Sequence, residues 1–326
     1  MNELQEERGK NMKNKEATAE NIPNLDQTVI DTLDFFTENP PPRIDVSKFK
    51  SPFVIGSGNA FNAGLIIFSA TGTTFADESN YRTILSSSNK KTQQGESRDV
   101  VVISASGSKD APSEIEFANQ NGLKTTLLTT KSESDAAKIA DKVIAYKSIA
   151  EPYTYNTSTY MGMILSATGE NPATIKQYIE SLKLPEKFAE HKYFAFVVPD
   201  EFMQICPMLE IKNHELFASY GGLRAFPQGH ARHAKFVVRN PEELVITLGD
   251  KNEVFGDPNH RWDIDLPKGI GYGAIMAITY YLVGKIQESK PPYFKNNIAR
   301  YVSRDGPAAY GPNTKPFTVI VPGSET

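Results

Sequence analysis

Two serines and a lysine follow an apolar run in a pattern suited to binding a phosphate. The run at residues 101–103 leads into Ser104, Ser106 and Lys109, and helix-compatible sequence follows from about residue 112 to 121. The first backbone N–H groups of a helix have no partner within it, and the helix dipole favours negative charge there. Serine hydroxyls and a lysine ammonium add donors to those amides. The segment predicts an anion pocket; a plain strand–turn–helix corner with a solvated Lys109 is the alternative.

A second strand–loop–helix unit lies upstream at residues 53–64. Its glycines, among them Gly58, permit a tight turn and close approach of the backbone to a ligand. Asn59 and Ala60 complete this loop. A dinucleotide-binding fold would require G-x-G-x-x-G and an acidic residue about 20 positions further on. Phe61 departs from that glycine pattern, so we do not predict a dinucleotide cofactor.

Length and composition limit the class of protein. The chain has 326 residues, 39% hydrophobic residues and a net charge of −4, which is enough for one large or two medium domains. The negative charge gives no general attraction to nucleic acid or anionic membranes. The single Cys206 favours a reducing compartment, and no apolar run approaches the roughly 20 residues that cross a bilayer. We therefore expect a cytoplasmic protein without nucleic-acid or membrane partners.

Hydrophobic periodicity predicts alternating strands and helices. The predicted strands are 53–55, 100–104, 125–129, 143–146, 193–198 and 244–248. The predicted helices are 24–39, 112–121, 156–166, 172–182, 202–217 and 272–286. Such alternation is typical of α/β folds with parallel sheets covered by helices.

The alternating pattern restarts once along the chain, which predicts two α/β halves. Residues 1–22 are charged and are expected to be a disordered tail. The first domain is expected at 23–182, a polar linker at 183–192, and a second domain with the C-terminal tail at 193–326.

The second half offers a carboxylate and two histidines with possible chemistry. Glu210 lies between apolar residues of a predicted helix. Partial desolvation there would raise its pKa toward the range useful to a general base, although an exposed helix glutamate has the same spacing. His230 and His233 form a short H-x-x-H without a nearby cysteine, which does not amount to a zinc motif. We predict no metal site.

The glycine-containing loop at 53–64 together with S-x-S-G at 104–107 resembles the sugar isomerase (SIS) domain family. The resemblance extends over most of residues 52–302 and is closest to the double-SIS group. It implies two SIS-type subdomains, each a mostly parallel sheet flanked by helices in a flavodoxin-like three-layer sandwich. It also implies that Ser104 and Ser106 bind a sugar phosphate. Ala60 replaces the serine that is usual in the first phosphate loop, and Lys109 replaces a threonine.

Residues 151–157 resemble the family's Glu-x-x-x-x-Ser-Thr stretch, which lines the sugar. The resemblance places Glu151, Asn156 and Thr157 among the substrate-binding residues. Asn156-Thr157 replace Ser-Thr and still offer amide and hydroxyl groups. Asn156 would also suit a helix N-cap, and both roles are compatible.

Three further segments resemble the family's catalytic motifs. Residues 208–211 resemble Leu-Lys-Glu-Ile, which implies that Glu210 moves the proton between sugar C1 and C2. Residues 225–233 resemble the loop whose histidine assists ring opening, which implies that role for His233. This loop typically completes the site of a neighbouring subunit, so a homodimer is expected. Residues 295–300 resemble Arg-Asn-Leu-Ala-Lys, with Arg300 in place of the lysine. Arginine keeps the positive charge but cannot form a Schiff base.

The resemblance therefore implies an aldose–ketose isomerase that acts on a hexose 6-phosphate and requires neither a metal nor another cofactor. Two alternatives stay open. One is an aminosugar-6-phosphate deaminase/isomerase or deglycase, which differs only in the amine that leaves. The other is a regulator that binds a sugar phosphate without catalysis.

Overall fold

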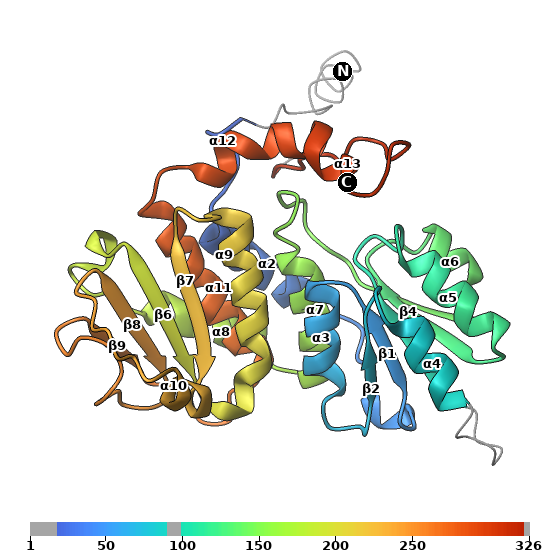
Figure 1. Cartoon of the computed structure of the whole chain (residues 1–326), viewed down its shortest axis with the longest axis horizontal. Coiled ribbons are helices and arrows are strands. Elements are labelled where there is room, and N and C mark those ends of the chain that lie inside the picture. Colours follow the sequence, from blue (N-terminus) through green and yellow to red (C-terminus); the bar gives the residue numbers. More distant parts are fainter. Residues whose placement is uncertain (1–17, 90–98, 323–326) are drawn as a thin grey trace, which may run out of the picture.

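The computed structural model describes residues 18–89 and 99–322, and it builds them around two parallel sheets (Figure 1). The strand orders are β2-β1-β3-β4-β5 and β7-β6-β8-β9, so the expected α/β class with mostly parallel sheets is confirmed. Residues 1–17 of the predicted tail lie outside the described residues, whereas Ile22 at its end is buried. Among the described residues, no helix is both long and apolar enough to span a bilayer.

The first sheet carries apolar side chains on both faces. Its strands are β1 (Phe53–Gly56), β2 (Thr74–Ala76), β3 (Asp99–Ile103), β4 (Lys124–Thr129) and β5 (Lys142–Ala145). Successive side chains of a strand point to opposite faces. Val54 and Val101 therefore join the main core, while Phe53 and Val100 join a second cluster. The main-core face is covered by α3 (Asn59–Phe68), and the other face by α4 (Tyr81–Asn89), α5 (Ala111–Gln120) and α6 (Asp135–Ile139).

The second sheet has a thinner cover on its outer face. Its strands are β6 (Tyr193–Val198), β7 (Gly222–Pro227), β8 (Glu243–Leu248) and β9 (Arg261–Ile264). The inner face packs against α9 (Cys206–Leu216), which follows a 3₁₀ turn at Asp200–Ile205, and α11 (Tyr272–Glu288). The outer face is covered by a small cluster that includes Ala231 of α10 (Gln228–Ala234), Phe236 and Phe255.

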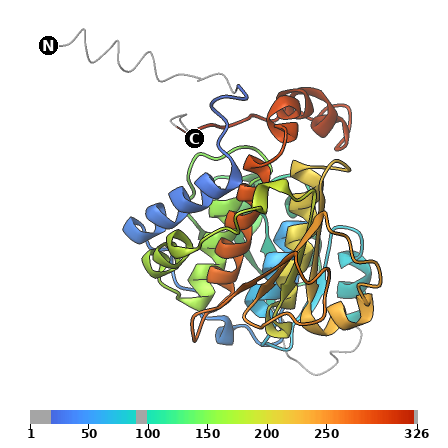
Figure 2. The same ribbon diagram turned by 90° about the vertical axis from the view of Figure 1, so that its left-hand side faces the viewer.

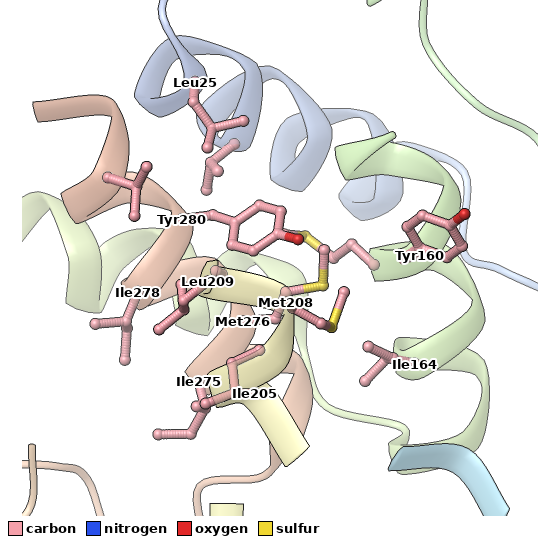
Figure 3. Close-up of a cluster of buried hydrophobic side chains, with 14 of the residues drawn as sticks. Leu25, Tyr160, Ile164, Ile205, Met208, Leu209, Ile275, Met276, Ile278 and Tyr280 are labelled. Atoms are coloured by element: carbon pink, nitrogen blue, oxygen red, sulfur yellow. The ribbon is translucent and has the colours of Figure 1, made fainter. Parts of the chain in front are cut away.

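The two halves share one core of helices between the sheets. This core combines α2 (Leu25–Glu38), α7 (Thr157–Thr168) and α8 (Pro172–Ser181) with α3, α9 and α11. Leu25, Tyr160, Met208 and Tyr280 meet there from four different helices (Figure 3). A Cβ added at Gly284 would lie 1.9 Å from the Asp26 amide nitrogen, so α2 and α11 approach closely. Residues predicted in the first domain thus pack directly on the second.

The predicted linker and the C-terminal tail are both packed. Within 183–192, the 3₁₀ turn Phe188–Glu190 buries Phe188, and His191 Nε2 lies 2.8 Å from His260 Nδ1. After α11 come α12 (Tyr293–Arg300), a π-helical turn at Tyr301–Asp305 and α13 (Gly306–Ala308). This C-terminal segment lies at the top of the molecule in both views, whereas α10 lies near the bottom (Figures 1 and 2).

Candidate functional site

The loop between β3 and α5 is fixed by hydrogen bonds and leaves several amides free to bind a ligand. Ser104 Oγ accepts the Gly107 amide at 3.1 Å, and the Ala105 carbonyl accepts from the Thr130 hydroxyl at 2.8 Å. Gly107 has a φ of +58°, and a Cβ there would lie 2.0 Å from Ser134 Oγ, so this position requires glycine. Within residues 18–89 and 99–322, the backbone amides at positions 106 and 108–110 have no acceptor. Such a group of amides at a helix N-terminus suits an anion.

The loop after β1 lies beside the loop after β3. Gly56 pairs with Ile103 across the sheet, so both loops leave the same edge at adjacent strands. Gly58 has a φ of +55°, and a Cβ there would meet no atom within 4 Å. Asn59 and Ala60 begin α3 and are buried. Ala60 offers no side-chain donor, so the hydroxyls at this edge belong to Ser57 of this loop and to the serine loop after β3.

Lys109 points to aromatic residues of other segments. Its Nζ donates to the Tyr153 hydroxyl at 3.2 Å. It also lies 4.1 Å from the ring centre of Tyr310 and 4.5 Å from that of Phe317, within the range of cation–π attraction. Desolvation lowers the pKa of Lys109, and the neighbouring Asp110 opposes this. The predicted phosphate partner therefore holds the C-terminal segment beside the serine loop.

Glu151 caps α7 in this structure. Its carboxylate accepts the amides of Thr157 and Ser158 at 2.7 and 3.1 Å and the Ser158 hydroxyl at 2.6 Å. Asn156 occupies the N-cap position, as the sequence suggested, but its φ is +47° and its side chain makes no cap hydrogen bond. The expected cap is therefore supplied by Glu151 from six positions upstream. Both carboxylate oxygens of Glu151 are engaged by the protein, and Thr157 is buried.

Helix α9 places Glu210 at the surface and buries a different pair. Glu210 is exposed, so the partial desolvation expected from its apolar neighbours is absent. Lys212 is fully buried, and its Nζ lies 2.5 Å from Glu215 Oε2. At 3.6 residues per turn, Glu210 and Glu215 are separated by about 140° around the helix. Leu209 and Ile211, which suggested desolvation, are neighbours in sequence but do not cover the Glu210 carboxylate.

The Lys212–Glu215 pair is held in an apolar and aromatic environment. Lys212 Nζ also donates to the Thr154 carbonyl at 2.6 Å and lies 5.6 Å from the Tyr280 ring centre. Desolvation raises the pKa of Glu215, and Lys212 partly opposes this. Desolvation likewise raises the pKa of Glu151, against its hydrogen bonds and the charge of Lys212. Burial therefore favours the protonated form of both carboxyl groups more than solvent exposure would.

The serine loop and the buried pair are connected through two consecutive residues. Lys109 contacts the side chain of Tyr153, and Lys212 contacts the carbonyl of Thr154. Consecutive Cα atoms are about 3.8 Å apart. The serine loop and the Lys212–Glu215 pair therefore adjoin the same short segment.

His233 and Arg300 are not brought to this segment within one chain. His233 is exposed on α10, near the opposite end of the molecule from α13 (Figure 1). Arg300 is exposed as well, and its Nε lies 3.4 Å from Asp305 Oδ2. Among the described residues, no group of three histidine, cysteine or acidic side chains is placed to hold a metal ion.

Sequence reasoning missed Lys212, Glu215 and Tyr153. The one available signal was the i, i+3 spacing of Lys212 and Glu215, which puts both on one helix face. A cavity of about 500 Å³ lies elsewhere, at the second sheet, lined by residues such as Arg224, Phe236 and Val238. It has no contact with the serine loop, so the polar contacts described above define the candidate site better than cavity size.

Comparison with known proteins finds similarity at the level of structure. No protein-family model matches the chain, and no curated protein sequence matches it. The C-terminal domain of glucosamine-fructose-6-phosphate aminotransferase from Francisella tularensis is 13% identical with a TM-score of 0.54, covering 81% of this chain and 92% of that one. Glucosamine-6-phosphate deaminase from Thermotoga maritima is 14% identical (TM-score 0.53; 80% and 92% covered). Tagatose-6-phosphate ketose/aldose isomerase from Escherichia coli is 14% identical (TM-score 0.53; 82% and 92% covered). The fold implied by the resemblance to double-SIS proteins is thereby confirmed.

Proposed function

We propose that this protein is an aldose–ketose isomerase that acts on a hexose 6-phosphate. The observation that carries the proposal is the meeting of the serine loop and the buried Lys212–Glu215 pair at Tyr153 and Thr154. The names of the three similar structures, an aminotransferase, a deaminase and an isomerase of hexose 6-phosphates, support the same substrate class.

The phosphate binds at the loop between β3 and α5. Its donors are the hydroxyls of Ser104 and Ser106, the N-terminus of α5 and the amides at 106 and 108–110, for which the described part of the chain offers no acceptor. Loss of these contacts would weaken binding of the substrate and of the transition state equally, because the phosphate does not take part in the reaction.

Proton transfer between C1 and C2 is assigned to Glu215. Its carboxylate takes the proton from C2 of the aldose and returns it to C1, while the Lys212 ammonium stabilises the oxyanion of the enediolate. Glu215 is preferred to the sequence-based candidate Glu210 because it is desolvated and paired with a cation, whereas Glu210 is exposed. Lys212 likewise supplies the positive charge expected of Arg300, which pairs with Asp305.

A homodimer is part of the proposal. His233 belongs to α10, which lies at the opposite end of the molecule from α13 (Figure 1), whereas Lys109 of the serine loop contacts Tyr310 just after α13. His233 can therefore assist ring opening only in the site of a second copy. The test mixes two inactive variants, His233→Ala and Glu215→Gln, after separate purification and subunit exchange. Recovery of activity, reaching about a quarter of the wild-type specific activity in a fully exchanged mixture, supports a shared site. Two inactive proteins that stay inactive, although native mass spectrometry with one variant tagged shows mixed dimers, would refute it.

A sugar-phosphate-binding regulator is the second candidate, favoured by the exposure of Glu210, His233 and Arg300. The wild-type protein separates the two. NMR in D₂O with fructose, glucose, mannose and glucosamine 6-phosphates is expected to show turnover and deuterium at C2 for one of them. Release of ammonia from the amino sugar would instead indicate the deaminase. Saturable binding of a sugar phosphate without exchange would establish the regulator.

A further inference from the structure

The segment from Glu151 to Ser158 forms a closed ring whose geometry depends on one carboxylate. Glu151 spans six and seven residues to accept the amides of Thr157 and Ser158 and the Ser158 hydroxyl. Ser158 Oγ in turn accepts the Ile149 amide at 3.3 Å. The three hydrogen bonds to Glu151 therefore join the start of this segment to the first turn of α7.

The closed ring holds a strained backbone. Thr154 has a φ of +76° and Asn156 a φ of +47°, in the left-handed region that residues other than glycine seldom adopt. Such conformations persist only where surrounding contacts impose them. Because the Asn156 side chain makes no cap hydrogen bond, the Glu151 carboxylate is the group that closes the ring over these two residues.

The ring contacts both parts of the candidate site. The Tyr153 hydroxyl accepts from Lys109 of the serine loop, and the Thr154 carbonyl accepts from Lys212 at 2.6 Å. The Tyr155 hydroxyl donates to the carbonyl of Pro23 at 2.9 Å, which fastens the ring to the core. The position of the Thr154 carbonyl, and with it the position of Lys212, thus depends on the closure at Glu151.

We infer that Glu151 is a positioning residue, which sets the Lys212–Glu215 pair through the ring 151–158 and does not itself bind the sugar. Its oxygens already accept three hydrogen bonds from the protein. The Lys212 ammonium opposes the effect of desolvation on the pKa of both Glu151 and Glu215. The inference rests on the proposed function for its kinetic consequences, while its effect on Glu215 can be measured without a substrate.

The titratable groups around the pair predict the direction in which the pKa of Glu215 changes when Glu151 is replaced. The titratable side chains facing Glu215 are Lys212 on its own helix, Tyr153 and Tyr155 of the ring, Tyr160 of α7, Tyr280 of α11 and Tyr301 after α12. Desolvation raises the pKa of each of these tyrosines, so they remain neutral where Glu215 titrates. If the closure at Glu151 is lost, the Thr154 carbonyl no longer fixes Lys212, and the ammonium stabilises the Glu215 carboxylate less. The pKa of Glu215 then rises.

The variant Glu151→Gln tests the inference. Glutamine has one acceptor oxygen, so the amides of Thr157 and Ser158 cannot both keep separate oxygens. We expect kcat to fall by about tenfold or more because Lys212 and Glu215 lose their alignment. KM for the sugar phosphate should stay within about threefold, since the phosphate contacts are intact. The acidic limb of the pH–rate profile should move to higher pH, because Lys212 then stabilises the Glu215 carboxylate less.

Glu170→Gln is the matched control. Glu170 caps α11 in the same way, accepting the amides of Gly271, Gly273 and Ala274 at 2.7–3.1 Å, but it makes no contact with Lys212 or the ring. Glu170→Gln should lower the free energy of unfolding about as much as Glu151→Gln does, and it should leave kcat and the pH–rate profile unchanged. Equal kinetic effects of Glu151→Gln and Glu170→Gln would mean that Glu151 only caps α7. A rise in KM at unchanged kcat would make it a sugar ligand, and either result overturns the inference.

A substrate-free measurement separates this inference from the proposed function. Carbon-detected NMR of selectively labelled glutamate, assigned with Glu215→Gln, gives the titration midpoint of Glu215. The midpoint should be higher in Glu151→Gln than in the wild type, whether or not the wild type turns over a sugar phosphate; an unchanged or lower midpoint overturns the inference. If Glu151→Gln does not fold, Ser158→Ala removes only the hydroxyl bond at 2.6 Å and should shift the same midpoint less, in the same direction.

Discussion

Replacing Lys212 by methionine should destabilise the protein in a way that depends on pH. Methionine keeps the apolar stem of the buried side chain and removes only the ammonium. Lys212 is 0% exposed and lies 2.5 Å from the Glu215 carboxylate, whose side chain is 23% exposed. Removing one partner of a buried ion pair costs about 3–5 kcal/mol. Because Glu215 retains some contact with solvent, we expect the lower end of that range, about 3 kcal/mol at pH 8.

The sign of the pH dependence follows from Glu215. Burial already raises its pKa, and Lys212 opposes that rise; without the cation the pKa in the folded state rises further. A carboxyl with a raised folded pKa contributes stability that is fully present below its unfolded pKa and is lost as the pH rises through the folded pKa. The variant should therefore lose less at pH 5, about 1 kcal/mol, than at pH 8.

Urea unfolding at pH 5, 6, 7 and 8, at constant ionic strength, measures this difference. The control is Lys176→Met, which removes a cation 2.6 Å from Asp34 where the side chains are 25% and 55% exposed. Such a surface pair contributes below about 1 kcal/mol, and its loss should not vary between pH 6 and 8. If Lys212→Met costs the same at pH 5 and pH 8, or no more than Lys176→Met, the buried pair is not the charged unit described here.

Two other substitutions test the anion loop and the helix that follows it. Ser104→Ala with Ser106→Ala should raise KM for the sugar phosphate at least about tenfold and change kcat less than threefold, as steady-state kinetics would show; unchanged affinity would remove the proposed phosphate site. Glu114 is buried, its Oε1 has no partner among the described residues, and desolvation with the nearby Asp110 raises its pKa to about 8. Because the pKa is raised in the folded state, the free energy of unfolding of the wild type falls as the pH rises from about 4.5 to 8. Urea unfolding should therefore show Glu114→Gln gaining stability relative to the wild type over that interval, by about 2–4 kcal/mol. A difference that stays constant with pH would contradict the burial argument.

The long helices and strands could be predicted because their apolar residues recur with the period of one type of secondary structure. Strands β1, β3, β4, β6 and β8 and helices α2, α7, α8 and α11 lie where the apolar pattern placed them, within a few residues at each end. Strand β2 has three residues, and β7 starts with Gly222 and ends with Pro227. Such short or interrupted strands give too little alternation to be distinguished from loops, and they form because neighbouring strands supply hydrogen bonds.

The candidate site could be predicted only where it is local in sequence. The serine loop follows directly from an apolar strand and a helix start, so its residues were visible. The choice between Glu210 and Glu215 depended on which face of α9 turns inward, and a lysine such as Lys212 is ordinarily solvent-exposed. Its burial requires Thr154, a partner 58 positions away in the sequence. The contact between Lys109 and Tyr310 likewise joins segments that only the folded chain brings together.

The central claim is that Glu215 moves the proton between C1 and C2. The direct measurement is deuterium incorporation at C2 of the sugar phosphate in D₂O, compared for wild type, Glu215→Gln and Glu210→Gln at equal occupancy by substrate. Loss of a positioned acid–base group costs about 10²–10⁴-fold, so Glu215→Gln should lower the exchange rate by at least a hundredfold. Glu210→Gln should stay within threefold of wild type, because its carboxylate is exposed. Exchange at the wild-type rate in Glu215→Gln, or its loss in Glu210→Gln alone, would contradict the account.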